Sequence, residues 1–191
     1  MDYPCEFLPA ASLPPARHPL LQHLVETYVS ETNKTAAIWT ELRDDQLEFR
    51  PHPRSQSVRG ILEHQLLSER RFFAEFLGVP EPPVEAVLPP APSVQAYVGR
   101  LVELARPRVA AIAAGDESYW LGEVAFFDVR RPRIWVFWRR VLHTAHHRAQ
   151  IGLALRMLED RVPPTYGPTA DVTWTGADPT TTLDAARRTG A

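Results

Sequence analysis

Apolar residues recur at steps of three and four along most of this chain, which is the spacing of one face of an α-helix. Prolines separate the stretches that carry this pattern. The four longest stretches lie at about residues 19–43, 57–77, 93–115 and 130–158. Because each has a broad apolar stripe, each needs a partner that covers it. The pattern therefore predicts an all-α protein built as a four-helix bundle.

Residues that begin, end or bend helices stand near the expected boundaries. Ser55 or Ser57 can cap the start of the second helix, and Gly78 can end it. Ser93 can cap the third helix, but Pro107 lies inside it. A proline there removes a backbone hydrogen bond and clashes with the preceding turn. We therefore expect a kinked third helix, or a helix in two pieces.

The segments on either side of the last helix have no clear helical pattern. Residues 119–129 include Val-Ala-Phe-Phe at 124–127, which suits an extended linker or a short strand. Residues 161–191 are rich in Pro, Thr, Gly and Asp and cannot bury much apolar surface. We expect an irregular crossover, a bundle domain over residues 1–175 and a flexible C-terminal tail over residues 176–191.

The composition narrows the classes of protein that the chain fits. Its 191 residues are 45% apolar and 23% charged, as in an ordinary globular domain, which argues against disorder of the whole chain. The formal net charge is −2 and no long basic run occurs, which argues against a nucleic-acid partner. Charged residues and histidines interrupt the apolar stretch 134–158, so no membrane span is expected. A single cysteine, Cys5, and the lack of a signal-peptide pattern favour a cytoplasmic protein.

Two of the seven histidines form a pair on the last helix. His143 and His147 are four residues apart, so their side chains lie on one face, one turn apart. Val136, Ile151 and Leu158 lie on nearly the same face, which turns the pair toward the bundle interior. Burying two unpaired imidazoles there is unfavourable, and a metal ion is one partner that would satisfy them. Zinc, nickel, iron and copper all accept imidazole nitrogen, so the spacing does not choose the metal.

A third ligand must come from another helix. His64 is the one other histidine in a helix interior with apolar neighbours, Ile61 and Leu67, on both sides. The spacing alone does not show that its helix faces the pair. Hydrogen bonds to the backbone or to carboxylates would also satisfy the pair without metal. His146 points about 100° away from His147 and is expected at the surface or behind the ligands.

Two segments resemble the DinB/YfiT-like metalloenzymes. Residues 47–57, followed by Ile-Leu-Glu-His at 61–64, are similar to the start of that family's second helix. Residues 143–151, His-Thr-Ala-His-His-Arg-Ala-Gln-Ile, resemble its His-x-x-x-His-Arg-Gly-Gln signature on the last helix. The similarity extends over about residues 18–174. Ala149 stands where glycine is usual, a small change that still allows close helix packing.

The resemblance implies a metal site formed by three histidines. It carries the family's ligands over onto His64, His143 and His147. They would hold one divalent ion, with zinc or nickel as the first candidates and iron or manganese after them. The resemblance also implies a four-helix bundle, a homodimer and a small-molecule substrate. Family members with known chemistry use the ion in low-molecular-weight thiol transfer or in related hydrolase and isomerase reactions.

Three protein ligands leave a coordination position open, which is typical of catalytic rather than structural zinc sites. An ion with an open position lowers the pKa of a bound water or thiol. We therefore expect transfer of a low-molecular-weight thiol cosubstrate to an electrophilic substrate, or hydrolysis of a small molecule. A non-catalytic, stress-related metal-binding protein and a helical interaction module without metal are the alternatives.

Arg148 and Gln150 flank the ligand pair. Arg148 can anchor an anionic substrate or pair with an acid of the second helix, Glu63 or Glu69. Gln150 can orient a histidine ligand through the second ring nitrogen. No residue is assigned a catalytic role. Four aromatic residues at helical spacing are expected in the core rather than around a pocket: Trp39, Phe72, Trp135 and Trp138.

Overall fold

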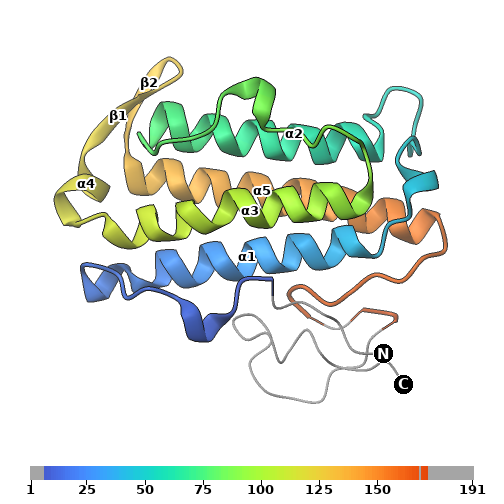
Figure 1. Cartoon of the computed structure of the whole chain (residues 1–191), viewed down its shortest axis with the longest axis horizontal. Coiled ribbons are helices and arrows are strands. Elements are labelled where there is room, and N and C mark those ends of the chain that lie inside the picture. Colours follow the sequence, from blue (N-terminus) through green and yellow to red (C-terminus); the bar gives the residue numbers. More distant parts are fainter. Residues whose placement is uncertain (1–6, 168, 172–191) are drawn as a thin grey trace.

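Four long helices form the body of the molecule in a computed structural model that describes residues 7–167 and 169–171. They are α1 (Gln22–Thr40), α2 (Val58–Arg71), α3 (Val94–Ala114) and α5 (Arg133–Met157). The helices lie side by side along the long axis of the molecule (Figure 1), with α1 packed against α3 and α5, and α2 against α5. The predicted four-helix bundle is therefore confirmed.

Short helical turns extend and connect these helices. A π-helical turn, η4 (Phe72–Phe76), continues α2, and a short helix, α4 (Glu117–Leu121), follows α3. Four 3₁₀ turns complete the helical elements of the described residues: η1 (Ala10–Ser12), η2 (Pro19–Leu21), η3 (Asp44–Gln46) and η5 (Val84–Ala86). Because η2 runs directly into α1, the first predicted helix does begin at Pro19, with a 3₁₀ turn as its first turn.

Serine caps and a glycine fix the helix boundaries. Ser57, one of the two serines considered for α2, accepts a hydrogen bond from the backbone N–H of Gly60 at 3.1 Å. Ser93 caps α3 in the same way, accepting from Ala96 at 3.1 Å. Gly78 follows the π-helical turn with φ +69°, a left-handed conformation that side chains disfavour. The start of α2, the start of α3 and the end of the π-helical turn therefore lie at residues predicted to begin or end helices.

Pro107 lies inside a continuous α3. The alternative of two separate helical pieces was therefore wrong. A single missing N–H leaves one carbonyl of the preceding turn without its helical donor, while the rest of α3 stays packed along α1. The kink expected at this proline stays a prediction.

A two-stranded antiparallel hairpin precedes α5. It consists of β1 (Glu123–Phe126) and β2 (Val129–Pro132), with Phe126 opposite Val129. The two residues between the strands form the turn, and Phe127 adopts a left-handed conformation there, with φ +53°. The strand alternative for residues 124–127 is thus partly confirmed, and the crossover is a hairpin instead of a linker.

The predicted start of the last helix, near Arg130, was wrong by a few residues. Residues 129–132 pair with β1 over the whole length of that strand, so their backbone is extended. α5 begins at Arg133, after Pro132, whose fixed φ of −58° suits the residue before a helix.

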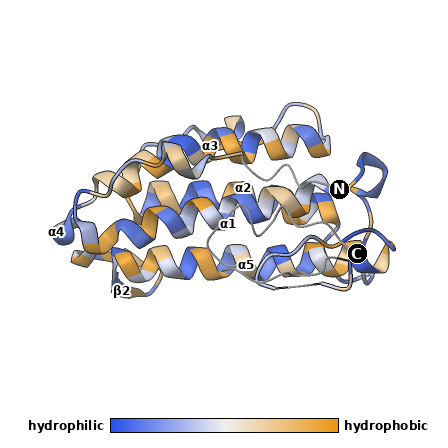
Figure 2. Ribbon diagram, turned by 90° about the horizontal axis from the view of Figure 1, so that it is seen from below, coloured by the Kyte–Doolittle hydropathy of each residue, from blue (hydrophilic) through white to orange (hydrophobic). Residues whose placement is uncertain are grey.

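Apolar side chains of all four helices meet in the interior. Hydrophobic and hydrophilic residues alternate along each helix in Figure 2, as expected for helices with one buried face. Leu24, Phe73 and Phe137 belong to one buried cluster, and Trp39 and Leu66 to a second. No helix of the described segments is long and apolar enough to cross a membrane.

Both ends of the described chain attach to the bundle. The side-chain amide of Asn33 accepts from Leu8 N and donates to Leu8 O, each at 3.0 Å. Near the other end, Arg156 Nη1 donates to Asp171 Oδ1 at 3.1 Å. The expected domain boundary at residue 175 and the tail at residues 176–191 lie outside the described residues.

Candidate metal centre

The structure brings together the three histidines that the sequence selected. His64 lies on α2, and His143 and His147 lie one turn apart on the face of α5 that packs against α2. Nε2 of His143 is 3.4 Å from Nε2 of His64 and 3.3 Å from Nε2 of His147. Although 79 residues separate His64 from His143, their helices are neighbours, so the three ring nitrogens converge on one point.

The spacing of these nitrogens fits one tetrahedral metal ion. Two nitrogens bound tetrahedrally to zinc at about 2.0–2.1 Å lie about 3.3–3.4 Å apart. The two Nε2–Nε2 distances to His143 match this separation. One ligand nitrogen from each of the three residues lies within 4.8 Å of the other two. The donor set, three neutral imidazoles, also suits zinc and nickel.

Burial and nearby positive charge keep the three rings neutral. Burial, followed by the charge of Arg140, lowers the pKa of His143 to about 3. The same two causes lower the pKa of His64. Burial also lowers the pKa of His147, more than its hydrogen bond with Gln150 raises it. At neutral pH each ring therefore has an unprotonated nitrogen, as a metal ligand requires.

Gln150 holds His147 in the tautomer that metal binding needs. Its Oε1 lies 2.8 Å from Nδ1 of His147. Because the amide oxygen only accepts, Nδ1 carries the proton and Nε2 presents its lone pair to the other two histidines. The structure thus places Gln150 beside His147 and hydrogen-bonded to its second ring nitrogen, the position expected of it.

Arg140 favours the opposite tautomer for His143, with the proton on Nε2. Its Nη1 lies 3.0 Å from Nδ1 of His143, and a guanidinium can only donate, so this Nδ1 accepts. A neutral His143 then carries its proton on Nε2 and can donate to His147. A metal ion on this Nε2 requires the proton on Nδ1, which leaves Arg140 its other partners, Ser68 Oγ at 3.0 Å and Glu69 Oε2 at 3.5 Å.

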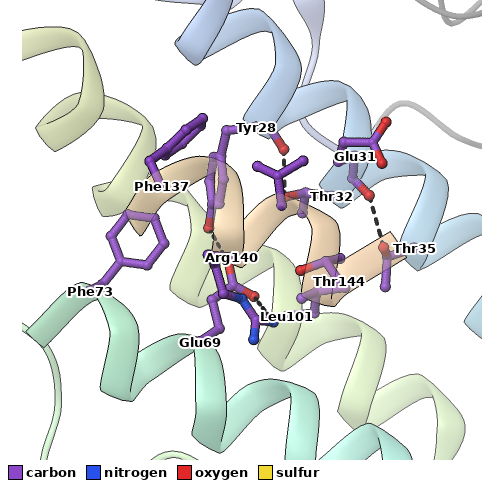
Figure 3. Close-up of a pocket in the computed structure, with 11 residues that line it drawn as sticks. Tyr28, Glu31, Thr32, Thr35, Glu69, Phe73, Leu101, Phe137, Arg140 and Thr144 are labelled. Carbon is purple, nitrogen blue, oxygen red and sulfur yellow. Dashed lines mark hydrogen bonds and ion pairs between the residues drawn. The ribbon is translucent and has the colours of Figure 1, made fainter. Parts of the chain in front are cut away.

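Arg140 belongs to a buried ionic network centred on Glu69. Glu69 accepts a 2.6 Å hydrogen bond from the hydroxyl of Tyr28 and faces Arg108 at 3.4 Å. In Figure 3, Tyr28 and Arg140 point toward Glu69 from different helices. Burial and the charge of Glu69 raise the pKa of Tyr28, so this hydroxyl keeps its proton and donates. A cavity of about 10 Å³ beside these residues has room for about one water molecule.

Arg148 was expected to pair with Glu63 or Glu69, and this prediction was wrong. Its guanidinium donates to Glu31 of α1 at 2.6 Å and also contacts the hydroxyl of Tyr166. The reason is that this side of α5 faces α1, whereas α2 lies on the histidine side. Arg148 is 1% exposed and already neutralised, so it is not available to anchor an anionic substrate.

Two arginines of the site were missed from the sequence. Arg140 stands three residues before His143, a helical spacing that places both on one face and was available as a signal. Arg139 lies beside it on the exposed surface and approaches the site from the solvent side. Nothing in the local pattern distinguishes Arg139 from the other surface arginines of α5.

The four aromatic residues expected in the core differ in where they lie. Trp39 is fully buried, as predicted. Phe72 is buried too, but it also lines a hollow beside the histidines. Trp135 is 41% exposed, so its expected core position was wrong; its ring lies at the surface, 5.4 Å from the ring of Phe126. Trp138 lies at the edge of the core and so fits the prediction only in part.

The hollow, of about 530 Å³, lies between α2, η4, the hairpin and α5. His64 and His143 line it, together with the rings of Phe72, Phe126 and Phe127. A small molecule in this space would lie directly against the two histidines. The histidine site is therefore reachable from solvent and has a volume that suits a ligand.

Comparison with known proteins agrees with this fold. A crystal structure of a DinB-like protein from Bacillus cereus is 18% identical, with a TM-score of 0.66, over 75% of this chain and 95% of that one. A DinB-like protein from Bacillus subtilis is 16% identical, with a TM-score of 0.62, over 75% and 97% of the two chains. No curated protein matches this chain. The model of the DinB superfamily matches residues 27–151, well over half of the sequence, and the chain therefore belongs to the DinB superfamily.

Proposed function

We propose that this protein binds one divalent metal ion through His64, His143 and His147 and is a metal-dependent enzyme that acts on a small molecule. The observation that carries the proposal is the pair of Nε2–Nε2 distances, 3.3 and 3.4 Å, which fit one tetrahedral ion. Zinc or nickel are the first candidates, with iron or manganese after them. Three ligands and an adjoining hollow support a catalytic rather than a structural role.

The residues around the ion would each have a defined task. When bound, a divalent ion lowers the pKa of a water or thiol ligand and so supplies a nucleophile near neutral pH. Gln150 keeps the proton of His147 on Nδ1 and thereby keeps Nε2 free. Phe72 and the hairpin place apolar surface beside His143, against which a substrate can pack. The proposed reaction is transfer of a low-molecular-weight thiol, in which the new C–S bond replaces the bond to a leaving group; hydrolysis is the related alternative.

Metal content is the first test. Protein purified without a histidine tag should contain about one zinc or nickel ion per chain after loading and desalting. His143→Ala should retain almost none. His52→Ala is the matched control, because His52 lies in an exposed loop, and it should bind as the wild type does. Equal metal content in all three proteins would overturn the proposed site.

Activity is the second test. Metal-loaded protein is incubated with a series of low-molecular-weight thiols and 1-chloro-2,4-dinitrobenzene, and the conjugate is followed by absorbance. Conjugation should require the metal and be lost in His143→Ala. A rate that equals that of the thiol alone, for every thiol, would remove the transferase proposal and leave hydrolysis to be tested in the same way.

A metal-free histidine cluster is a second candidate, supported by the contact of Arg140 with His143. If Nδ1 of His143 accepts from Arg140, its single Nε2–H can donate to His147 at 3.3 Å or to His64 at 3.4 Å, so hydrogen bonds hold this ring without metal. The protein would then be a helical interaction module. Wild-type protein without bound metal, whose thermal unfolding does not respond to zinc, would favour this candidate.

A further inference from the structure

The hollow beside the histidines has an aromatic wall. The rings of Phe72 and Phe126 lie 5.7 Å apart, and those of Phe126 and Phe127 lie 4.8 Å apart. Phe127 is 62% exposed, although a large apolar side chain is normally covered. Its left-handed backbone, with φ +53°, is unusual for a bulky residue, and such conformations concentrate at functional sites. The hairpin turn therefore keeps an aromatic ring at the mouth of the hollow at a conformational cost.

The charge around the hollow is entirely positive. Arg71 and Arg139 line it, and no carboxylate is among the described residues that do. Arg71 is occupied, since it pairs with Glu75 at 2.9 Å and stacks over Phe127 at 5.2 Å. Arg139 has no hydrogen-bonding or ion-pair partner within the described part of the chain. One guanidinium therefore remains free for an anion from outside.

We propose that this hollow binds a small molecule with a flat apolar body and a single anionic group. The body would lie against Phe72, Phe126 and Phe127, and the anionic group on Arg139. In this orientation the ligand would lie against His64 and His143. The inference rests on the proposed function, because it names the class of substrate on which the proposed enzyme acts. The volume of about 530 Å³ is within the usual range for small-molecule pockets.

The aromatic wall and the guanidinium of Arg139 would recognise different parts of the ligand. Aromatic surface binds any flat apolar body and does not distinguish charge. A guanidinium forms strong, charge-assisted hydrogen bonds with carboxylate, sulfonate or phosphate and weaker ones with the oxygen of a neutral amide. Arg139 should therefore decide between anionic and neutral ligands, while the phenylalanines should decide between flat and small ones.

Two probes of equal size separate these contributions. Binding of 1-naphthoate and of its neutral counterpart 1-naphthamide is measured by ligand-observed NMR on the full chain, both zinc-loaded and chelator-treated. Wild-type protein should bind naphthoate roughly tenfold more tightly than naphthamide. Arg139→Gln should remove this preference, and Phe127→Ala should weaken both probes several-fold. Arg106→Gln, the same charge change at an exposed site on α3, should change neither affinity.

The result identifies which proposal is at fault. Equal affinity for the two probes, no binding of either, or a preference that survives Arg139→Gln would overturn the inference. A preference that disappears with the chelator and survives Arg139→Gln would assign anion selection to the ion, which also overturns it. A preference that depends on Arg139 in protein that holds no metal would support the inference while the proposed function fails.

Discussion

At the scale of single residues, the described interior contains arginines that are almost completely buried, each facing a carboxylate from another element. Moving a charge out of water is costly, and a partner with good geometry offsets that cost without turning the pair into a large net gain. These side chains therefore fix the relative position of helices more than they add stability. The pairs are Arg108–Glu81 at 2.6 Å, Arg140–Glu69 at 3.5 Å and Arg148–Glu31 at 2.6 Å.

Loss of one partner from such a pair should be severe. Arg108→Gln leaves Glu81 buried without its cation and Glu69 with Arg140 alone, so we expect the free energy of unfolding to fall by about 3–5 kcal/mol in urea denaturation. Arg106→Gln, two residues earlier and exposed, should change it by less than about 0.5 kcal/mol. Similar losses in the two variants would show that the network is not a structural support.

The pair of Glu31 with Arg148 should make stability depend on pH in the acid range. Burial raises the pKa of Glu31, but the charges of Arg148 and Lys34 and the hydrogen bond from Tyr166 outweigh it, so the pKa lies below its ordinary value of 4.5. Because the folded pKa is the lower one, the contribution is present above about pH 4.5 and is lost as the pH falls through the folded pKa.

Glu31→Gln tests this dependence. The difference in unfolding free energy between wild type and variant should be largest near neutral pH and should shrink below about pH 4.5, where the wild-type carboxylate becomes protonated too. Denaturant unfolding at a series of pH values measures it. A difference that is constant across this range would mean that the charge of Glu31 contributes nothing.

At the scale of elements, glycines serve different purposes at the end of a helix and within one. Gly78 follows η4 with φ +69° and has open space where a Cβ would stand, so only its backbone conformation demands glycine. Gly99 lies within α3 at an exposed position, also with open space but with ordinary helical backbone. Two equal substitutions should therefore change stability in opposite directions.

Gly78→Ala should lower the free energy of unfolding by about 1 kcal/mol, because the added Cβ strains the left-handed backbone. Gly99→Ala should raise it by about 0.5–1 kcal/mol, because alanine loses less conformational entropy in a helix. Thermal or urea unfolding of the two variants beside the wild type gives both values. Changes of the same sign would contradict the assigned helix end.

Helix existence and helix starts could be predicted from the sequence because their causes are local. The 3–4 periodicity identifies the buried faces, and Ser57, Ser93 and Gly78 each act through contacts or dihedral angles within a few residues. The second strand could not be predicted. Residues Val129–Pro132 are mostly exposed and contain two arginines and a proline, so they lack the apolar pattern of a strand. Their extended backbone depends on pairing with β1.

The candidate site could likewise be predicted from the sequence only where its causes are local. The spacing of His143 and His147 made them a pair, whereas the convergence of His64 depends on how α2 and α5 pack, which the family resemblance supplied and periodicity did not. The partner of Arg148 was misjudged for that reason. An arginine on α5 pairs with whichever helix its own face meets, and that face meets α1.

At the scale of the whole molecule, the proposed ion would join two helices that are distant in sequence. Zinc at a free concentration one hundred times its dissociation constant should raise the unfolding free energy by about 2.7 kcal/mol, provided that the unfolded chain does not bind it. Urea unfolding with and without zinc measures this shift. His143→Ala should show no such increase, and an equal increase in that variant would place the bound zinc elsewhere.

The separation of 79 residues between His64 and His143 also sets an order of events during synthesis. A ribosome releases α2 long before α5, so the nascent chain has one of the three histidines until its last helix emerges. Closing so long a loop costs entropy that the packing of the helices must offset first. Under the proposed function, metal loading would therefore follow folding, and a chain interrupted before α5 would lack two of the three histidines that would hold the ion.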